Sequence, residues 1–160
     1  MSSQVLSTQE STEPTHVAWV RFLRAHAAIT RELSSRLEAL HELTLSDYDV
    51  LLQLYFAPER RMRRIDLARS VLLTASGITR LLDGLESCGL VEKARCEGDA
   101  RVVYACLTDS GVRKVEQARE SHLADVDELF GSRLEPDERE QLAELLGRLP
   151  LAHTSEACSS

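Results

Sequence analysis

The stretch that decides the fold is IDLARSVLLTASGITRLLDGLESCGLVEKA, residues 65–94. Its first seven residues have the apolar spacing of a short helix that offers four residues to a core, namely Ile65, Leu67, Ala68 and Val71. Thr74 is a favoured N-cap type, and the helix predicted after it, residues 75–89, would bury Ile78, Leu81, Leu82 and Leu85. Gly89 can adopt the left-handed conformation that ends a helix. Two helices joined by so few residues predict a helix-turn-helix.

A predicted β-hairpin follows at once. Residues 90–96 and 101–107 are strand-like segments, and Glu97-Gly98-Asp99-Ala100 between them is rich in turn-forming residues. If the turn occupies residues 97–100, Cys106 faces Val91 across the hairpin. Thr108 then caps a long helix from about Asp109 to Phe130. The order of elements predicts a winged helix-turn-helix.

Long amphipathic helices are predicted on both sides of this core. Between residues 17 and 40 one stripe holds Trp19, Leu23, His26, Leu33, Leu37 and Leu40. A second helix, capped by Ser46, stops at Pro58. A short basic stretch, residues 59–64, follows, in which Arg60 and Arg61 could form a solvated loop. A last helix runs from after residue 137 to about Leu149. The apolar stripes exceed what a winged core of about 50 residues can cover, which favours dimerisation.

The expected fold class is therefore mainly α with a small β-hairpin wing. The predicted organisation is a disordered tail (1–15), an N-terminal dimerisation helix (16–41), a winged helix-turn-helix DNA-binding lobe (46–108), C-terminal dimerisation helices (109–149) and a loose tail (150–160).

Charge is unevenly distributed along the 160 residues, whose net charge is −7. Residues 57–113 hold ten Lys and Arg against eight Asp and Glu, whereas both flanks are acidic. An acidic chain argues against non-specific coating of nucleic acid, but a slightly basic middle permits a local DNA-binding face. The sequence has neither a membrane-length apolar run nor the pattern of a signal peptide, so we expect a cytoplasmic protein without membrane contact.

The sequence gives no support for a metal, a cofactor or catalysis. Four cysteines, at positions 88, 96, 106 and 158, form no CxxC pair, and the five histidines are scattered. There is no Ser-His-Asp order and no phosphate-binding glycine loop. We therefore expect a protein that is not an enzyme and has no cofactor.

The helix-turn-helix and wing motifs, in this order, resemble the MarR family of bacterial transcription regulators over roughly residues 17–149. The family's wing pattern is Asp-x-Arg, then an apolar strand ending in Leu-Thr-x-x-Gly, which here is Asp99, Arg101, Leu107, Thr108 and Gly111. Ala100 stands where the family often has a basic residue, which predicts weaker DNA contact at the wing tip. The resemblance implies a homodimer on a pseudo-palindromic DNA operator, most commonly acting as a repressor.

The expected DNA contacts lie on the second helix of the motif and on the wing. Arg80 would read a base, with the alternative that it only pairs with Asp83 or Glu86. Arg101 would enter a minor groove while Asp99 orients it, with the alternative of a surface salt bridge. The full predicted set is Arg63, Arg64, Thr74, Ser76, Gly77, Thr79, Arg80, Arg95, Asp99 and Arg101.

The resemblance also implies a small aromatic or anionic effector that weakens DNA binding. Its candidate residues are Trp19, His26, Tyr48 and Asp49, although Trp19 and His26 could equally pack in a dimer interface. Leu81 and Lys93 stand where the urate-responsive subgroup has arginines, which argues against urate. Two other functions stay open, a redox-responsive regulator that uses a cysteine such as Cys88, and a winged-helix module for protein contacts.

Overall fold

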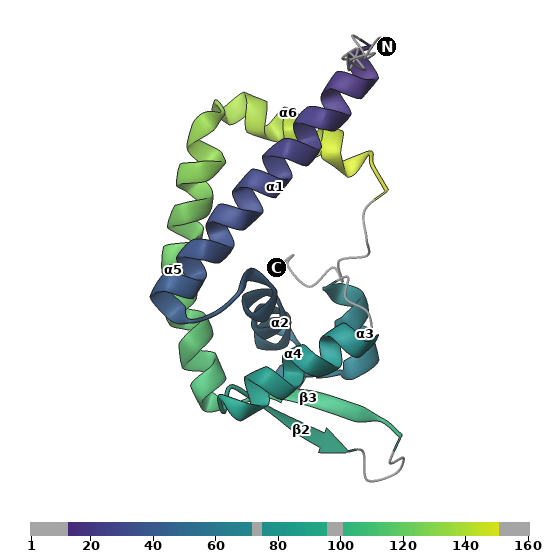
Figure 1. The fold of residues 1–160 in the computed structure, drawn as a ribbon, viewed down its shortest axis with the longest axis vertical. Helices are drawn as coiled ribbons and strands as arrows, with labels where there is room; N and C mark the ends of the chain where they lie inside the picture. The colour runs from purple at the N-terminus through teal and green to yellow at the C-terminus, as the bar shows by residue number, and fades with distance from the viewer. Residues whose placement is uncertain (1–12, 72–74, 96–100, 151–160) are drawn as a thin grey trace, which may run out of the picture.

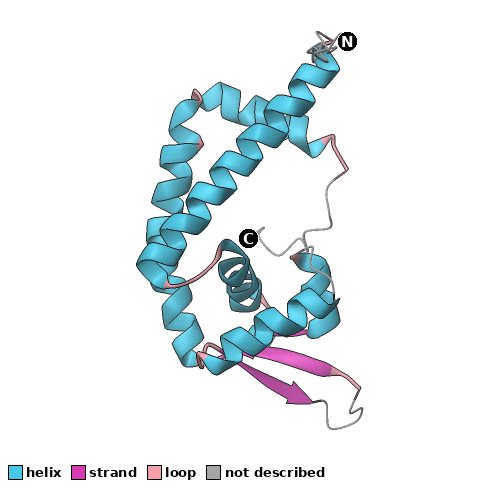
Figure 2. Cartoon of the chain, in the orientation of Figure 1, coloured by secondary structure: helices cyan, strands magenta, loops and turns pink. Residues whose placement is uncertain are grey.

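A computed structural model describes residues 13–71, 75–95 and 101–150, and it is mainly α-helical with a small sheet, as expected (Figures 1 and 2). The elements, in chain order, are α1 (Pro14–His41), α2 (Leu45–Phe56), a 3-10 turn (Pro58–Arg60), β1 (Arg61–Arg63), α3 (Arg64–Ser70), α4 (Ala75–Ser87), β2 (Val91–Arg95), β3 (Val103–Leu107), α5 (Asp109–Leu129), a second 3-10 turn (Gly131–Arg133) and α6 (Pro136–Gly147).

The long helices and the winged lobe lie at opposite ends of the molecule (Figure 1). α1 packs beside α5, and its N-terminal end lies far from the sheet. α2, α3, α4 and the three strands form the lobe, and the first turns of α5 reach into it. α5 thus connects the lobe to the outer helices.

One hydrophobic core holds these parts together. Val50, Leu51 and Leu54 of α2 are fully buried at its centre. Around them pack residues from α3, α4 and β2 of the lobe and from the two long helices, namely Leu37, Leu67, Ile78, Leu82, Val91 and Val115. Burying each such side chain contributes about 2 kcal/mol. Ile65, expected in this core, is instead 52% exposed, because α3 turns Leu67 and Ala68 inward.

Two helix starts differ from the sequence prediction. Thr44, not Ser46, caps α2: its hydroxyl accepts a hydrogen bond from the amide of Asp47 (3.1 Å), and the Asp47 carboxylate accepts one from the amide of Thr44 (2.9 Å). This reciprocal capping box satisfies two otherwise free amides. α1 begins at Pro14, inside the predicted tail, because a proline in the first turn needs no amide partner. Residues 1–12 and 151–160 lie outside the described residues.

The sheet has a third strand that sequence reasoning missed. β1 lies in the basic stretch 59–64, for which the sequence predicted no strand. It pairs antiparallel with β3 through Arg61 opposite Cys106 and Arg63 opposite Tyr104. The strand order is β1-β3-β2. Three residues with two exposed arginines carry no strand pattern of their own, so the pairing depends on β3.

The hairpin register is shifted by one residue from the prediction. Cys106 lies opposite Glu92 rather than Val91, and Val91 lies opposite Leu107. This register places Val91, Ala105 and Leu107 on one buried face. A slip of one residue would turn the buried set of one strand outward, which fixes the observed pairing.

The predicted ends of the helices beside the wing are confirmed. Gly89 has a φ of 71° just after α4. The Thr108 hydroxyl accepts a hydrogen bond from the amide of Gly111 (3.0 Å) and donates one to the carbonyl of Gly89 (2.7 Å). Thr108 therefore caps α5 and ties its start to the end of α4.

Candidate nucleic-acid interface

α4 presents a polar face opposite the one it buries. Ile78, Leu82 and Leu85 are buried, whereas Arg80 is exposed. α3 and α4 are adjacent in the lobe (Figure 1), in the arrangement of a helix-turn-helix. Thr74 lies outside the described residues, and the Ser76 side chain is not described either, so their predicted contacts remain predictions.

The start of α3 and the first turns of α4 are joined by a side-chain contact. Nη1 of Arg64 donates a hydrogen bond to the hydroxyl of Thr79 (3.3 Å). Arg63 lies one residue earlier, where its Nε donates a hydrogen bond to the hydroxyl of Tyr104 on β3 (3.4 Å). The structure therefore brings together Arg64 and Thr79, two of the predicted DNA-binding residues, and places Arg63 at the end of β1, within the sheet.

The acidic side chains of α4 do not hold Arg80. Asp83 and Glu86 both pair with Lys93 of β2 instead, with 3.0 Å between the lysine Nζ and the Glu86 carboxylate. Within the described ranges no carboxylate lies within ion-pair distance of Arg80. The structure therefore does not show the alternative in which Arg80 pairs along its own helix, and the Arg80 side chain is exposed.

The wing strands carry the remaining predicted arginines. Arg95 is exposed at the end of β2 opposite Val103, and Arg101 is exposed just before β3. β2 and β3 extend past α4 away from the long helices (Figure 1). Asp99 lies outside the described residues, so its pairing with Arg101 remains a prediction.

The four predicted effector residues do not come together within one chain. Trp19 and His26 stand on the outer half of α1, where Phe22 links them with ring centroids 6.2 and 6.4 Å away. The spacing of three and four residues could have revealed Phe22 as part of this aromatic row. At about 1.5 Å per residue, Trp19 lies about 27 Å along α1 from Leu37, where α1 meets the core around α2.

Tyr48 and Asp49 lie in the first turns of α2, in the lobe. Tyr48 is 3% exposed and packs against the ring of His122, with centroids 4.6 Å apart. Burial raises the pKa of the Asp49 carboxyl, opposed by a hydrogen bond with Gln53. Tyr48 is thus a core residue in this structure, and only Asp49 keeps a partly exposed polar group.

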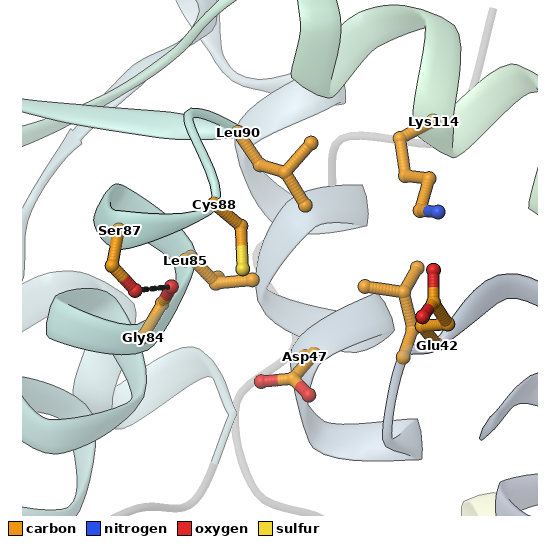
Figure 3. A pocket seen from close by; sticks show the side chains of 9 residues that line it. Glu42, Asp47, Gly84, Leu85, Ser87, Cys88, Leu90 and Lys114 are labelled. Carbon is orange, nitrogen blue, oxygen red and sulfur yellow. Dashed lines mark hydrogen bonds between the residues drawn. The ribbon is translucent and has the colours of Figure 1, made fainter.

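A cleft of about 500 Å³ lies elsewhere, where the lobe meets the long helices (Figure 3). Its walls come from the α1–α2 turn, the start of α2, the end of α4 with the residues after it, and the start of α5. They include Glu42, Asp47, Leu85, Cys88, Leu90 and Lys114. None of the predicted effector residues lines it. Sequence reasoning missed the cleft because four separate segments build it.

Comparison with known proteins identifies the chain. A sequence profile of the MarR family matches residues 41–102, from the end of α1 through β2. The uncharacterized HTH-type transcriptional regulator YkoM of Bacillus subtilis is 31% identical over 125 residues, which is 78% of this chain and 79% of YkoM. The chain belongs to the MarR family.

Solved MarR-family structures share its fold. Sco3205 of Streptomyces coelicolor, in complex with DNA, superposes with a TM-score of 0.78 at 26% identity, covering 82% of each chain. A mutant MarR from E. coli, complexed with operator DNA, has a TM-score of 0.74 at 27% identity and covers 84% of this chain and 95% of that one. As a MarR-family protein, the chain is a DNA-binding transcriptional regulator with a winged helix-turn-helix.

Two further features of the described residues concern membrane-spanning helices and metal-binding groups. Among the described residues, no helix is both long and apolar enough to cross a membrane. In the same part of the chain, no group of three or more histidine, cysteine or acidic side chains is arranged to hold a metal ion.

Proposed function

We propose that this MarR-family protein is a homodimeric repressor that reads a pseudo-palindromic operator and is released from it by a small aromatic or anionic molecule. The observation that carries the DNA-binding part is the exposed side chain of Arg80 on α4, one residue after Thr79, whose hydroxyl accepts a hydrogen bond from Arg64. A recognition helix reads the major groove from such exposed side chains in its first turns.

The proposal assigns three kinds of contact to the predicted residues. Arg80 reads a guanine, with Thr79, Ser76 and Thr74 beside it, and Gly77 allows close approach of the backbone. Arg63 and Arg64 bind phosphates. Arg101, oriented by Asp99, enters the minor groove, and Arg95 gives a second wing contact.

Apolar exposure on the outer helices supports the dimer. Trp19 is 56% exposed, and Leu23, Leu123, Leu145 and Leu149 are also widely exposed on α1, on α5 and at the end of α6. Large apolar side chains gathered on the helices outside the lobe favour burial against a second copy. Two copies would present their α4 helices to half-sites about one DNA turn apart, about 34 Å.

For the effector, we propose a site made by two chains. Trp19 and His26 lie too far along α1 to meet Tyr48 and Asp49 of the same chain, so the partner's first helix would have to supply one part. Release requires that the effector bind the DNA-free conformation more tightly than the DNA-bound one.

A redox role for Cys88 is the second candidate. Its thiol is exposed on the cleft, whereas burial raises the pKa of the Cys106 thiol and so reduces its thiolate fraction. Loss of DNA binding after oxidation in the wild type, but not in Cys88→Ser, would favour this candidate over the small-molecule effector.

Fluorescence anisotropy with a duplex from the gene's own upstream region tests the DNA contacts. We expect Arg80→Ala to weaken binding by about 1–3 kcal/mol and to relax specificity at one base pair. Arg101→Ala should also weaken binding. Arg139→Ala, an exposed arginine on α6, is the matched control and should bind as the wild type does.

The same titrations decide between the candidate functions. If Arg80→Ala and Arg101→Ala leave the Kd and its salt dependence unchanged, the DNA contacts are misassigned and a protein-interaction module becomes the better reading. Addition of phenolic acids and of urate to the wild-type complex then tests effector release.

A further inference from the structure

β2 carries a lysine on the face where a strand normally buries an apolar residue. Lys93 lies opposite Ala105, which is 1% exposed, and two residues after Val91, which is also 1% exposed. Because side chains alternate along a strand, Lys93 shares the face that packs toward α4. Its side chain is only 28% exposed.

Two carboxylates of α4 hold this lysine in place. Asp83 and Glu86 are three residues apart, so they lie on the same side of the helix. The lysine ammonium donates a hydrogen bond to Asp83, and its Nζ lies 3.0 Å from Glu86. The hydrogen bond to Asp83, followed by that to Glu86, raises the pKa of Lys93, so the ammonium stays charged.

The ion pairs of Lys93 with Asp83 and Glu86, here called the Lys93 tie, join β2 to α4. These are the two elements proposed to contact DNA. β2 is an edge strand, since the order is β1-β3-β2, and β3 is its one neighbour in the sheet. β1 pairs with β3 and not with β2, so within the described residues no second strand supports the β2 side of the β2–β3 ribbon. The Lys93 tie is therefore well placed to stop the ribbon from rotating relative to α4.

We propose that Lys93 is a positioning residue that sets the angle between the recognition helix and the wing, so that α4 and Arg101 engage adjacent grooves together. The proposal rests on the DNA-binding function above. Lys93 itself touches no base or phosphate, since its ammonium is engaged by two carboxylates.

A double-mutant cycle with Arg101 tests the idea. Lys93→Met in the wild-type background should weaken operator binding about tenfold, because the wing no longer meets its groove. In an Arg101→Ala background the same change should cost less than about twofold, because the wing contact is already absent. Additive losses would overturn the proposal.

Two companion variants show that the tie, rather than a folding defect, is responsible. Asp83→Asn/Glu86→Gln removes the tie from the α4 side and should reproduce the Lys93→Met loss. Lys93→Arg keeps both partners and should restore affinity to within about twofold of the wild type. The Tm of each variant is measured alongside its operator affinity. If the loss of affinity correlates with the loss of Tm across all variants, in the Arg101→Ala background as well, a folding defect explains the result and the positioning role is wrong.

Neutralisation of charge and direct phosphate contact give different results. If Lys93 only shields the carboxylates from DNA, the triple variant Asp83→Asn/Glu86→Gln/Lys93→Met recovers affinity, whereas positioning predicts that it stays weak. If Lys93 binds a phosphate, Lys93→Met in the Arg101→Ala background lowers the salt slope by about 0.9. Positioning predicts an unchanged slope there.

The outcomes separate this inference from the proposed function. Wild-type binding by both Arg80→Ala and Arg101→Ala would overturn the proposed function and the inference together. Weakened binding by Arg80→Ala with an inert Arg101→Ala would overturn the wing contact and Lys93 positioning, but leave the recognition helix standing. Weakened binding by both, with an additive or absent Lys93 effect, would overturn the inference alone.

Discussion

At the scale of single residues, protonation of the His122 ring should affect the packing between α2 and α5. Its ring packs on Tyr48, and among the described residues its buried Nδ1 has no hydrogen-bond partner. Burial lowers the pKa of His122 below its ordinary value, partly opposed by Asp125. An imidazolium would place an unpaired N–H donor against the α2–α5 contact, which costs free energy.

This histidine should make folding stability depend on pH. A histidine with a lowered pKa in the folded state contributes stability that is present above its unfolded pKa, about 6.5, and is lost as pH falls through the folded value. We expect the wild-type Tm to fall between about pH 7 and pH 5 more steeply than that of His122→Leu. Equal pH dependence of the two Tm curves would contradict this.

Comparison with the variant is needed because Asp49 acts in the opposite direction. Burial raises the pKa of that carboxyl, so its contribution to stability is present at low pH and is lost as pH rises through the folded value. The difference between the wild type and His122→Leu cancels the Asp49 contribution. His41, whose ring contacts Ser121 at 2.7 Å, is present in both proteins.

At the scale of elements, the junction between the wing and α5 explains the Leu-Thr-x-x-Gly motif. Thr108 caps the helix, and Gly111 lies where a Cβ would overlap the Leu90 carbonyl oxygen and come within 2.6 Å of the Leu107 side chain. α5 therefore approaches Leu90, in the turn between α4 and β2, as closely as only a glycine allows.

Gly111→Ala should destabilise this junction. We expect a loss of about 1–3 kcal/mol in the free energy of unfolding, measured in urea, because the backbone must shift to admit a methyl group. Gly84→Ala is the matched control: it lies in α4, where an added Cβ would meet nothing within 4 Å, so it should be neutral or stabilise by up to about 1 kcal/mol. Equal effects of the two substitutions would refute the close approach.

At the scale of the whole molecule, α1 and α5 are joined by charge as well as by apolar packing. Arg36 contacts Asp125 at 2.7 Å and Glu128 at 2.9 Å, and it also pairs with Glu32 on its own helix. These contacts hold α1 against α5 and leave the aromatic row of α1 facing outward. The outer apolar surface is therefore presented on a braced pair of helices, as a dimer interface requires.

A charge placed on that surface should separate the dimer. We expect Leu23→Glu to shift the mass measured by light scattering from twice 17.9 kDa toward 17.9 kDa and to weaken operator binding. Ile65 of α3 is 52% exposed, against 42% for Leu23, but it lies in the lobe, so Ile65→Glu should remain dimeric. A wild type that is monomeric at all concentrations would contradict the proposed dimer.

Local sequence was sufficient for much of this protein. The apolar spacing of α4, the glycine at its end, the Thr108 cap and the order of helix-turn-helix and wing all depend on residues a few positions apart, whose preferences act before distant parts of the chain meet. The family resemblance rested on these motifs, and comparison with known proteins confirmed it.

Contacts between distant residues decided the rest. β1 exists because β3 offers it a partner, and the hairpin register follows from which residues reach the core rather than from the turn. Asp83 and Glu86 pair with Lys93, and not with Arg80, because β2 packs on α4. The separation of Trp19 from Tyr48 follows from the length of α1. The local sequence determines which backbone conformations have low free energy. Strand pairing and ion pairing between distant residues depend instead on which side chains the packed core brings within contact distance.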